Sequence, residues 1–362
     1  MTHRVYNFNA GPAALPLEVL EEAQSELLNF NSTGMSILEI SHRSKDYEAV
    51  NSEAEALVKQ LFGAPDNYRV LFLQGGASTQ FAAVPLNLVP TDGHADYILT
   101  GSWAEKAYDE ASKFVKTNIA ASTKSENYTR IPGTGEIKLS DDPAYVHLCA
   151  NNTIFGTEWQ TFPDFGNVPV VADMSSDIMS RRVDVSKFAL IYAGAQKNLG
   201  PAGVTLVIIR KDLLEKIPSS IPTMLRYDIH AKNDSLYNTP PAFSVYIVNL
   251  VLHWLKNNGG LVAMERRNQD KAAYIYDTID HSGGFYRGHA AKDSRSLMNI
   301  TFRLPNEDLE KSFASEATKQ GLIGLKGHRS VGGLRASTYN AVSLEACQAL
   351  AEFMKVFQSK NG

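Results

Sequence analysis

The sequence is poor in cysteine and has no long hydrophobic run. Its two cysteines, Cys149 and Cys347, lie far apart and form no C-x-x-C pair, which argues against a disulfide framework or a zinc knuckle. No apolar run approaches the roughly 20 residues of a membrane helix, and residues 1–16 lack the uninterrupted apolar stretch of a secretory signal. We therefore expect no targeting segment, no metal site and no membrane partner, and we expect a reducing cytoplasm.

The chain also lacks a dominant charge of one sign. Lys and Arg number 35 against 39 Asp and Glu, a formal net charge of −4, so there is no overall field for nucleic acid and any anion site must be local. With 44% hydrophobic and 20% charged residues, disorder is excluded as the main state. A chain of 362 residues is long enough for a large core and a smaller second domain.

The hydrophobic pattern predicts an α/β fold. Two amphipathic helices, over residues 17–30 and 46–62, precede short apolar runs rich in Val, Ile and Leu. These runs are residues 70–73, 97–100, 145–149, 168–172, 190–193 and 204–209. Continuous apolar strands suit a mostly parallel sheet covered on both faces, which binds ligands at the carboxyl ends of its strands.

The pattern changes in the last third of the chain. A Gly-Gly break near residue 257 leads into a helical stretch through residue 279. Strands follow near residues 297–304 and 332–339, and a last helix covers residues 344–357. We interpret this part as a smaller α+β domain.

The most informative loop is Ala-Gly-Ala-Gln-Lys-Asn-Leu-Gly-Pro-Ala-Gly at residues 193–203, between two apolar strands. A lone loop lysine is usually solvated. Here Gly194, Gly200 and Gly203 surround Lys197 and allow the backbone to approach a ligand closely. A lysine at the mouth of a sheet can lose its water shell and form a Schiff base with a carbonyl.

A carboxylate precedes that loop by one strand. The strand at residues 168–172 runs into Asp173, and such an aspartate more often caps a turn or holds a metal through water. Together with Lys197, however, it matches the needs of a pyridoxal phosphate enzyme. The acid keeps the ring nitrogen protonated and the lysine carries the aldehyde.

A third feature could hold a phosphate. A strand runs into Gly75 and Gly76 and then into a helical pattern at residues 81–88. Backbone N–H groups at a helix start bind phosphate, although this turn alone is weak evidence because it matches neither G-x-G-x-x-G nor the P-loop. Trp103 follows the next strand, and either stacking on a ring or ordinary core packing would explain it.

Taken together, the motifs resemble the phosphoserine aminotransferase family over essentially the whole chain. The matching segments, in chain order, are residues 9–12, 41–43, 75–77, 193–203, 238–241 and 327–337. The resemblance implies a homodimeric fold-type-I enzyme dependent on pyridoxal 5′-phosphate (PLP), with a mostly parallel seven-stranded sheet. It implies a large domain at residues 16–260 and a small α+β domain made of residues 1–15 and 261–362.

The resemblance also implies the roles of individual cofactor-binding residues. Lys197 would form the Schiff base and Asp173 would pair with the pyridine nitrogen, the two catalytic residues. The other cofactor-binding residues would be Trp103 on the ring, Thr153 near the ring hydroxyl, Ala77, Ser78 and Gln196 at the phosphate, and Asn238 and Thr239 from the neighbouring subunit.

For the substrates, the resemblance implies a shared site for two anionic groups. Arg335 would bind the α-carboxylate, and two His-Arg pairs, His42 with Arg43 and His328 with Arg329, would bind the distal anion. Some family members carry an arginine where this chain has Ser78, so one positive charge is missing here.

The implied reaction transfers the amino group of L-glutamate to 3-phosphohydroxypyruvate, giving O-phospho-L-serine and 2-oxoglutarate for serine biosynthesis. The resemblance leaves open whether 4-phosphohydroxythreonine, of pyridoxine biosynthesis, is also used.

Other readings of these residues stay open. Within the cofactor class, the chain could be an aminotransferase for another small acid, or a lyase, which would release no 2-oxoglutarate. Outside it, a noncatalytic protein that binds phosphorylated metabolites could keep the same fold. A nicotinamide-dependent enzyme is disfavoured because no G-x-G-x-x-G follows a strand, and no P-loop or H-E-x-x-H site is present.

Overall fold

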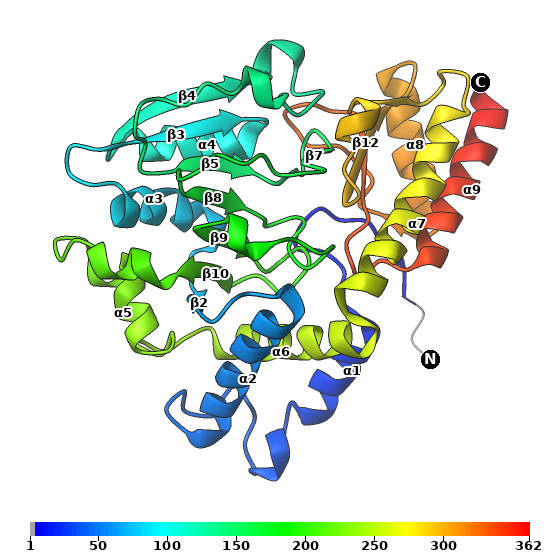
Figure 1. The fold of residues 1–362 in the computed structure, drawn as a ribbon. Helices are drawn as coiled ribbons and strands as arrows, with labels where there is room; N and C mark the ends of the chain where they lie inside the picture. The colour runs from blue at the N-terminus through cyan, green and yellow to red at the C-terminus, as the bar shows by residue number, and fades with distance from the viewer. Residues whose placement is uncertain (1–3) are drawn as a thin grey trace.

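A twisted seven-stranded sheet forms the centre of the computed structural model, which describes residues 4–362 (Figure 1). The strand order is β2-β10-β9-β8-β5-β3-β4. The bounds are β2 Tyr68–Leu73, β3 His94–Leu99, β4 Lys116–Ser122, β5 Val146–Cys149, β8 Val170–Asp173, β9 Leu190–Gly194 and β10 Thr205–Arg210. All neighbouring pairs are parallel except those of β10, which is antiparallel to both β2 and β9. The predicted α/β fold with a mostly parallel sheet is confirmed.

Helices cover both faces of this sheet, and alternate strand residues divide between them. In β2, Val70 and Phe72 pack toward one hydrophobic core, and Leu71 and Leu73 pack toward the other. The first core includes residues of α2 (Lys45–Phe62), α6 (Ala242–Asn257) and the start of α7 (Gly260–Asp280). The second includes residues of α3 (Gly76–Leu88), α4 (Ser102–Ala111) and α5 (Tyr227–Lys232). Burial on both faces explains why the strands are apolar at nearly every position.

Hydrophobic patterning did not predict several elements, among them α6 and the edge strand β4. The helix α6 carries a continuous run of buried residues from Val245 to Leu252, and α1 (Leu17–Glu26) packs against it. The described residues include no helix long and apolar enough to cross a membrane.

Local signals set the ends of α2. The Ser44 hydroxyl accepts from the backbone N–H of Tyr47 at the start of this helix, and Gly63 adopts a φ of 69° at its end.

A separate hydrophobic core lies beside the large sheet, between a three-stranded antiparallel sheet and three helices. Its strands are β11 (Arg287–Gly288), β12 (Asn299–Arg303) and β14 (Leu334–Ser337), packed with α8 (Glu307–Lys319), α9 (Leu344–Asn361) and the second half of α7. The N-terminal β1 (Tyr6–Asn7) pairs with β13 (Leu322–Ile323), and Phe8 belongs to this core. A domain made of residues 1–15 and 261–362 therefore stays our prediction, with α7 running through the boundary.

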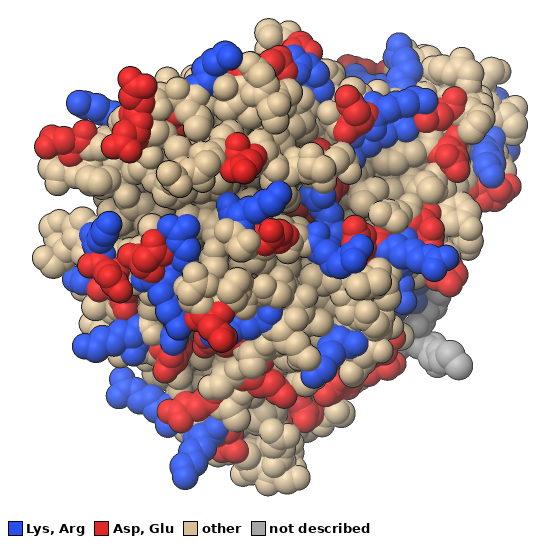
Figure 2. Space-filling view, in the orientation of Figure 1, with Lys and Arg blue, Asp and Glu red and all other residues tan. Residues whose placement is uncertain are grey.

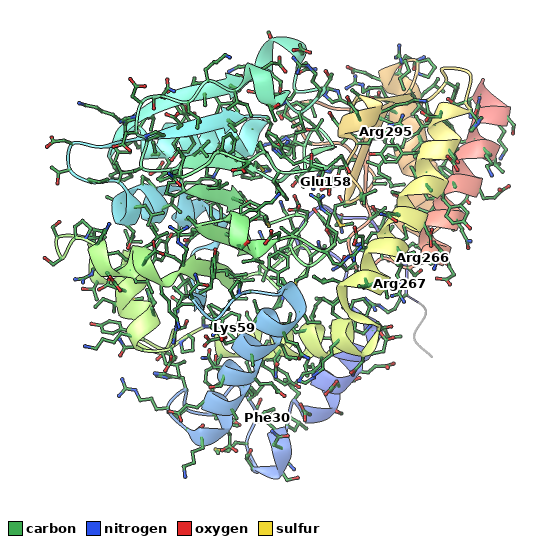
Figure 3. The ribbon with its side chains drawn as sticks, in the orientation of Figure 1. Phe30, Lys59, Glu158, Arg266, Arg267 and Arg295 are labelled. Carbon is green, nitrogen blue, oxygen red and sulfur yellow. The ribbon has the colours of Figure 1, made fainter. Side chains whose placement is uncertain are left out.

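A short hairpin lies between the large sheet and the separate core beside it. It consists of β6 (Asn151–Asn152) and β7 (Thr157–Glu158), and Thr157 makes a β-bridge with Arg295. The buried Glu158 carboxylate accepts from the backbone N–H of Leu297 at 2.7 Å and pairs with Arg181 at 3.1 Å. Figure 3 shows Glu158 and Arg295 between the large sheet and the smaller core. This junction fixes the sheet edge relative to β12 and β14.

Candidate active site

The predicted lysine and aspartate lie at the carboxyl ends of two interior strands of the large sheet, β8 and β9. Asp173 is the last residue of β8 and is 5% exposed, and its Oδ1 accepts from the backbone N–H of Ser175 at 2.9 Å. Lys197 lies three residues beyond the end of β9, and its Nζ donates to Thr153 Oγ1 at 2.8 Å. The parallel strands thus bring together two groups that are well separated in sequence.

The charges of these two side chains influence each other. Burial raises the pKa of Asp173, whereas hydrogen bonds from Ser175 and the charge of Lys197 lower it. Burial lowers the pKa of Lys197, and Asp173 opposes that shift. Burial is the larger effect in both cases. Near neutral pH the lysine is therefore easier to deprotonate than a solvated lysine, as a nucleophilic amine requires.

An aromatic ring lies next to the lysine. Trp103, in the first turn of α4, is partly buried, and Lys197 Nζ lies 5.8 Å from the centroid of its ring. A second lysine, Lys106, lies 4.4 Å from the same centroid. The Trp103 Nε1 is buried and has no hydrogen-bond partner within the described part of the chain. A core tryptophan usually pairs that donor, so this ring fits a ligand site better than ordinary packing.

The Gly-Gly turn begins α3 with an open N-terminus. Gly75 is the N-cap with a φ of 92°, and no side chain of residues 4–362 caps this helix end. Ala77 and Ser78 lie in the first turn, where backbone N–H groups have no partner inside the helix; the Ser78 side chain is exposed. The arrangement offers an anion site at this end of the helix.

The N-terminal segment covers the lysine loop. A Cβ on Gly11 would lie 3.5 Å from Lys197 Cγ and 3.7 Å from Gln196 Cγ, at a φ of +145°. The Ala13 N–H donates to the Gln196 carbonyl at 2.9 Å, and the Tyr339 hydroxyl donates to the Ala10 carbonyl at 2.8 Å. The sequence marked this Asn-Ala-Gly-Pro segment only as a motif, because no local pattern reports a contact with residues so far along the chain.

Arg335 reaches the same site from β14. Its Nη1 donates to the Thr153 carbonyl at 3.1 Å, and its Nε is buried without a partner among residues 4–362. Burial lowers the pKa of this guanidinium, and Tyr339 opposes the shift. A held guanidinium with an unused donor is suited to a carboxylate.

The two His-Arg pairs lie in different places. His328 lines a cavity of about 200 Å³, and its Nδ1 lies 2.7 Å from Ser330 Oγ. Burial and the charges of Arg335 and Arg329 lower its pKa, so this pair is close to Arg335. His42 lines another cavity, of about 340 Å³, formed by residues 38–42 and 239–244. Within the described part of one chain, the pairs do not line a common cavity; Arg43 and Arg329 are both exposed.

Asn238 and Thr239 lie close to the open end of α3 in their own chain. The Thr239 carbonyl accepts from Gln74 Nε2 at 2.9 Å. Asn238 lines a cavity of about 470 Å³ together with Gly75 and Thr79. Their expected contribution to a neighbouring subunit is not tested by one chain and stays a prediction.

No metal centre accompanies these residues. Among residues 4–362, no three His, Cys, Asp or Glu side chains gather in a way that could hold a metal ion. Charges of both signs are interspersed over the face shown in Figure 2. The described residues that meet at the site offer an amine, a carboxylate, an aromatic ring and a guanidinium.

Comparisons with known proteins identify the family of the chain. The family model of the class-V aminotransferases matches residues 5–350. Among curated relatives, the phosphoserine aminotransferases of Lysinibacillus sphaericus and Bacillus subtilis are 61% identical over 361 residues and 56% identical over 360 residues, covering 100% and 99% of both chains.

Solved structures give the same result. The phosphoserine aminotransferase from Bacillus circulans subsp. alkalophilus is 56% identical, has a TM-score of 0.98 and is covered, like this chain, to 100%. The PLP-bound phosphoserine aminotransferase from Trichomonas vaginalis is 41% identical with a TM-score of 0.93, over 97% of this chain and 100% of that one.

Proposed function

Because the chain belongs to the class-V aminotransferase family, in its phosphoserine aminotransferase branch, we propose that it transfers the amino group of L-glutamate to 3-phosphohydroxypyruvate. The products are O-phospho-L-serine and 2-oxoglutarate, a step of serine biosynthesis. The observation that carries this proposal is full-length identity of 61% to a phosphoserine aminotransferase. The pairing of Lys197 with Asp173 at the carboxyl ends of β8 and β9 supplies the chemistry that the reaction needs.

The cofactor is PLP, and the residues present fit it. The open N-terminus of α3 suits its phosphate, and Trp103 has a buried donor without a partner in the described chain. In this proposal Lys197 holds the aldehyde, Asp173 the ring nitrogen, Trp103 the ring face and Thr153 the ring hydroxyl. The phosphate is bound by Ala77, Ser78 and Gln196, and by Asn238 and Thr239 across the subunit boundary. When bound, PLP supplies an electron sink and carries the amino group between substrates.

Lys197 is the group that moves the proton at the substrate α-carbon. Its Nζ donates to Thr153 Oγ1 at 2.8 Å, which orients the amine. Burial lowers its pKa, so it can accept a proton as a base and return it as an acid near neutral pH.

Asp173 keeps its negative charge at the opposite end of the site. The Ser175 N–H donates to its Oδ1, and the positive charge of Lys197 also favours the carboxylate. An anionic Asp173 stabilises a proton on the ring nitrogen that faces it.

Arg335 and the two His-Arg pairs select the substrates. Both amino donors carry an α-carboxylate, which the Arg335 guanidinium would bind as a planar fork. Their distal anions, a phosphate or a γ-carboxylate, would meet His328 with Arg329 and His42 with Arg43. Ser78 adds a hydroxyl but no charge in the first turn of α3.

We place the complete site in a homodimer. Leu28, Met35 and Leu38 expose 85%, 45% and 62% of their surface on the segment that leads to His42 and Arg43. Exposed apolar groups in one segment are typical of an interface, and a second copy covering them would bring the His42 pair toward another subunit's site. The free thiols of Cys149 and Cys347 are compatible with the cytoplasm we propose.

The test combines product analysis with one variant. Purified protein with O-phospho-L-serine and 2-oxoglutarate should yield glutamate, and Lys197→Ala should reduce the rate by at least about 10²–10⁴-fold, because the proton carrier is lost. The exposed Lys187, changed to alanine, is the matched control and should leave the rate unchanged. Appreciable transamination by Lys197→Ala would exclude its role. An active enzyme that ignores phosphoserine, or releases no 2-oxoglutarate from glutamate, would favour another acid or a lyase.

A further inference from the structure

Two buried polar side chains lie beneath Asp173 on the neighbouring strands. Asp173 on β8 is the register partner of Tyr192 on β9 and of Cys149 on β5. His147, two residues before Cys149, shares its face of the sheet because strand side chains alternate. The His147 Nε2 lies 2.8 Å from the Tyr192 hydroxyl, and the two rings are stacked with centroids 6.0 Å apart. Asp173 on β8, Tyr192 on β9 and His147 on β5 therefore lie on one face of three neighbouring strands, and we call these three residues the row.

The tautomer of His147 determines which atom donates in each hydrogen bond of the row. His147 is 2% exposed, its Nδ1 is buried without a partner among residues 4–362, and burial lowers its pKa to about 3, so the ring is neutral. If Nε2 accepted from Tyr192, a buried Nδ1–H donor would stay unpaired and Tyr192 would have no proton for Asp173. If Nε2–H donates to the Tyr192 oxygen, the phenol proton is free for Asp173 and only a lone pair stays unpaired. The second arrangement makes one hydrogen bond more.

We propose that His147 and Tyr192 are positioning residues for Asp173. The His147 Nε2–H donates to the Tyr192 oxygen, and the Tyr192 O–H donates to the Asp173 carboxylate. The row thus supplies a hydrogen-bond donor to the buried Asp173 carboxylate from within the sheet. The ring nitrogen of the cofactor would face the same carboxylate from the site. This inference rests on the proposed function only in giving Asp173 that cofactor role.

The environment explains why such donors are needed. Burial raises the pKa of Asp173, whereas Ser175 and Lys197 lower it most and Tyr192 adds a smaller influence in the same direction. Tyr97 stacks on His147 with centroids 5.1 Å apart, but its hydroxyl pairs with Tyr145 and not with the histidine. The titratable groups around the row are Cys149 on β5, Tyr97 on β3, Tyr145, Tyr227 on α5, Lys197 and Asp177. Among these neighbours only Lys197 supplies a positive charge, so hydrogen-bond donors, those of Ser175 first and that of Tyr192 after them, add to the stabilisation of the anion.

The first test is the tautomer of His147 in the wild-type holoenzyme. Imidazole ¹⁵N NMR of protein labelled at histidine identifies the protonated nitrogen, and the signal is assigned by its loss in His147→Gln. We expect a neutral ring protonated at Nε2 from pH 6 to 9. A ring protonated at Nδ1 would overturn the proposal. This measurement needs no substitution in the sample that is interpreted.

The second test compares buried tyrosines by their effect on cofactor retention. Tyr192→Phe removes one hydrogen bond to a charged group, a loss of about tenfold or more in PLP affinity. Tyr97→Phe, on β3 and two strands from Asp173, is the matched control and should leave the affinity unchanged. Equal affinities for the two variants would refute the role of Tyr192.

Substitution of His147 gives a graded result. His147→Gln keeps a side-chain N–H donor, and His147→Leu does not. We expect PLP affinity to be closer to the wild type in His147→Gln, and equal losses in both would refute the role of the His147 donor. If the wild type failed to transaminate phosphoserine, the proposed function would fail. If it transaminates while Tyr192→Phe retains PLP normally, only the row of donors fails.

Discussion

Replacing Arg335 by alanine should weaken both amino donors, L-glutamate and O-phospho-L-serine, to a similar degree. Its guanidinium is held by the bond from Nη1 to the Thr153 carbonyl at 3.1 Å, and its buried Nε has no partner among residues 4–362. Because this donor is already desolvated, a carboxylate that binds to it does not have to displace a protein partner. The anionic group common to both donors is the α-carboxylate.

The magnitude follows from the bonds lost. A carboxylate held by two N–H groups of one guanidinium makes two charge-assisted hydrogen bonds, each worth about 1.5–3 kcal/mol. Losing both costs about 3–6 kcal/mol, or about 10²- to 10⁴-fold in kcat/KM at about 1.36 kcal/mol per tenfold. Arg335→Lys keeps the charge but not the planar fork, so its loss should be intermediate.

Initial-rate kinetics with each donor measure the effect, and O-phosphoethanolamine supplies the control. This compound is phosphoserine without the α-carboxylate, so its inhibition constant should be the same for the wild type and Arg335→Ala. The reasoning is refuted if only one donor is weakened, or if phosphoethanolamine loses as much affinity as phosphoserine.

Two further predictions concern the phosphate site and the pH dependence of stability. In Gly75→Ala the new Cβ would overlap the Thr79 side chain at a φ of +92°, so PLP should dissociate faster. Gly34→Ala tests backbone strain alone, because it has a φ of +77° and no described atom lies within 4 Å of the Cβ. Equal rates of PLP dissociation from the two variants would contradict this reasoning. Burial lowers the pKa of the fully buried Lys271 to about 7. Between about pH 7 and the ordinary lysine pKa, the unfolded state therefore binds more protons than the folded state. Over this range the free energy of unfolding rises with pH, by up to about 1.4 kcal/mol per pH unit. Urea unfolding at pH 7 and 9 should show a smaller rise in Lys271→Met, and an unchanged rise would mean that Lys271 does not titrate in this range.

The strands of the sheet interior were predictable because their environment is uniform. Burial on both faces makes nearly every position apolar, and the six predicted runs correspond to β2, β3, β5, β8, β9 and β10. The apolar pattern did not predict whether each strand is parallel or antiparallel to its neighbours. β10 is antiparallel to both neighbours, and an apolar run carries no sign of its orientation.

Two missed elements show the limits of hydrophobic periodicity. The strand β4 lies at the sheet edge, and most of its residues are partly or fully exposed, so Lys116–Ser122 contains no continuous apolar run. The helix α6 is buried around most of its circumference, which removes the contrast between faces that marks an amphipathic helix. Both environments are set by distant parts of the chain.

In the site, Lys197 and Asp173 could be found from sequence because glycines and a strand end mark them. His147 and Tyr192 lie inside apolar strands, where nothing distinguishes them from core residues until the register places them beside Asp173. The contact between Gly11 and Lys197 likewise depends on the fold alone.

The pairing of β1 with β13 has a consequence for synthesis of the protein on the ribosome. Tyr6 leaves the ribosome about 300 residues before Leu322, its partner in the parallel pair, which corresponds to roughly 15–60 s at the usual rates of elongation. Residues 9–13 can pack against the Lys197 loop only after that loop has been made, and Tyr339, whose hydroxyl donates to the Ala10 carbonyl, follows about 140 residues later still. The cover over the lysine is therefore completed only when nearly the whole chain has been made, so a nascent or prematurely terminated chain holds an open lysine loop.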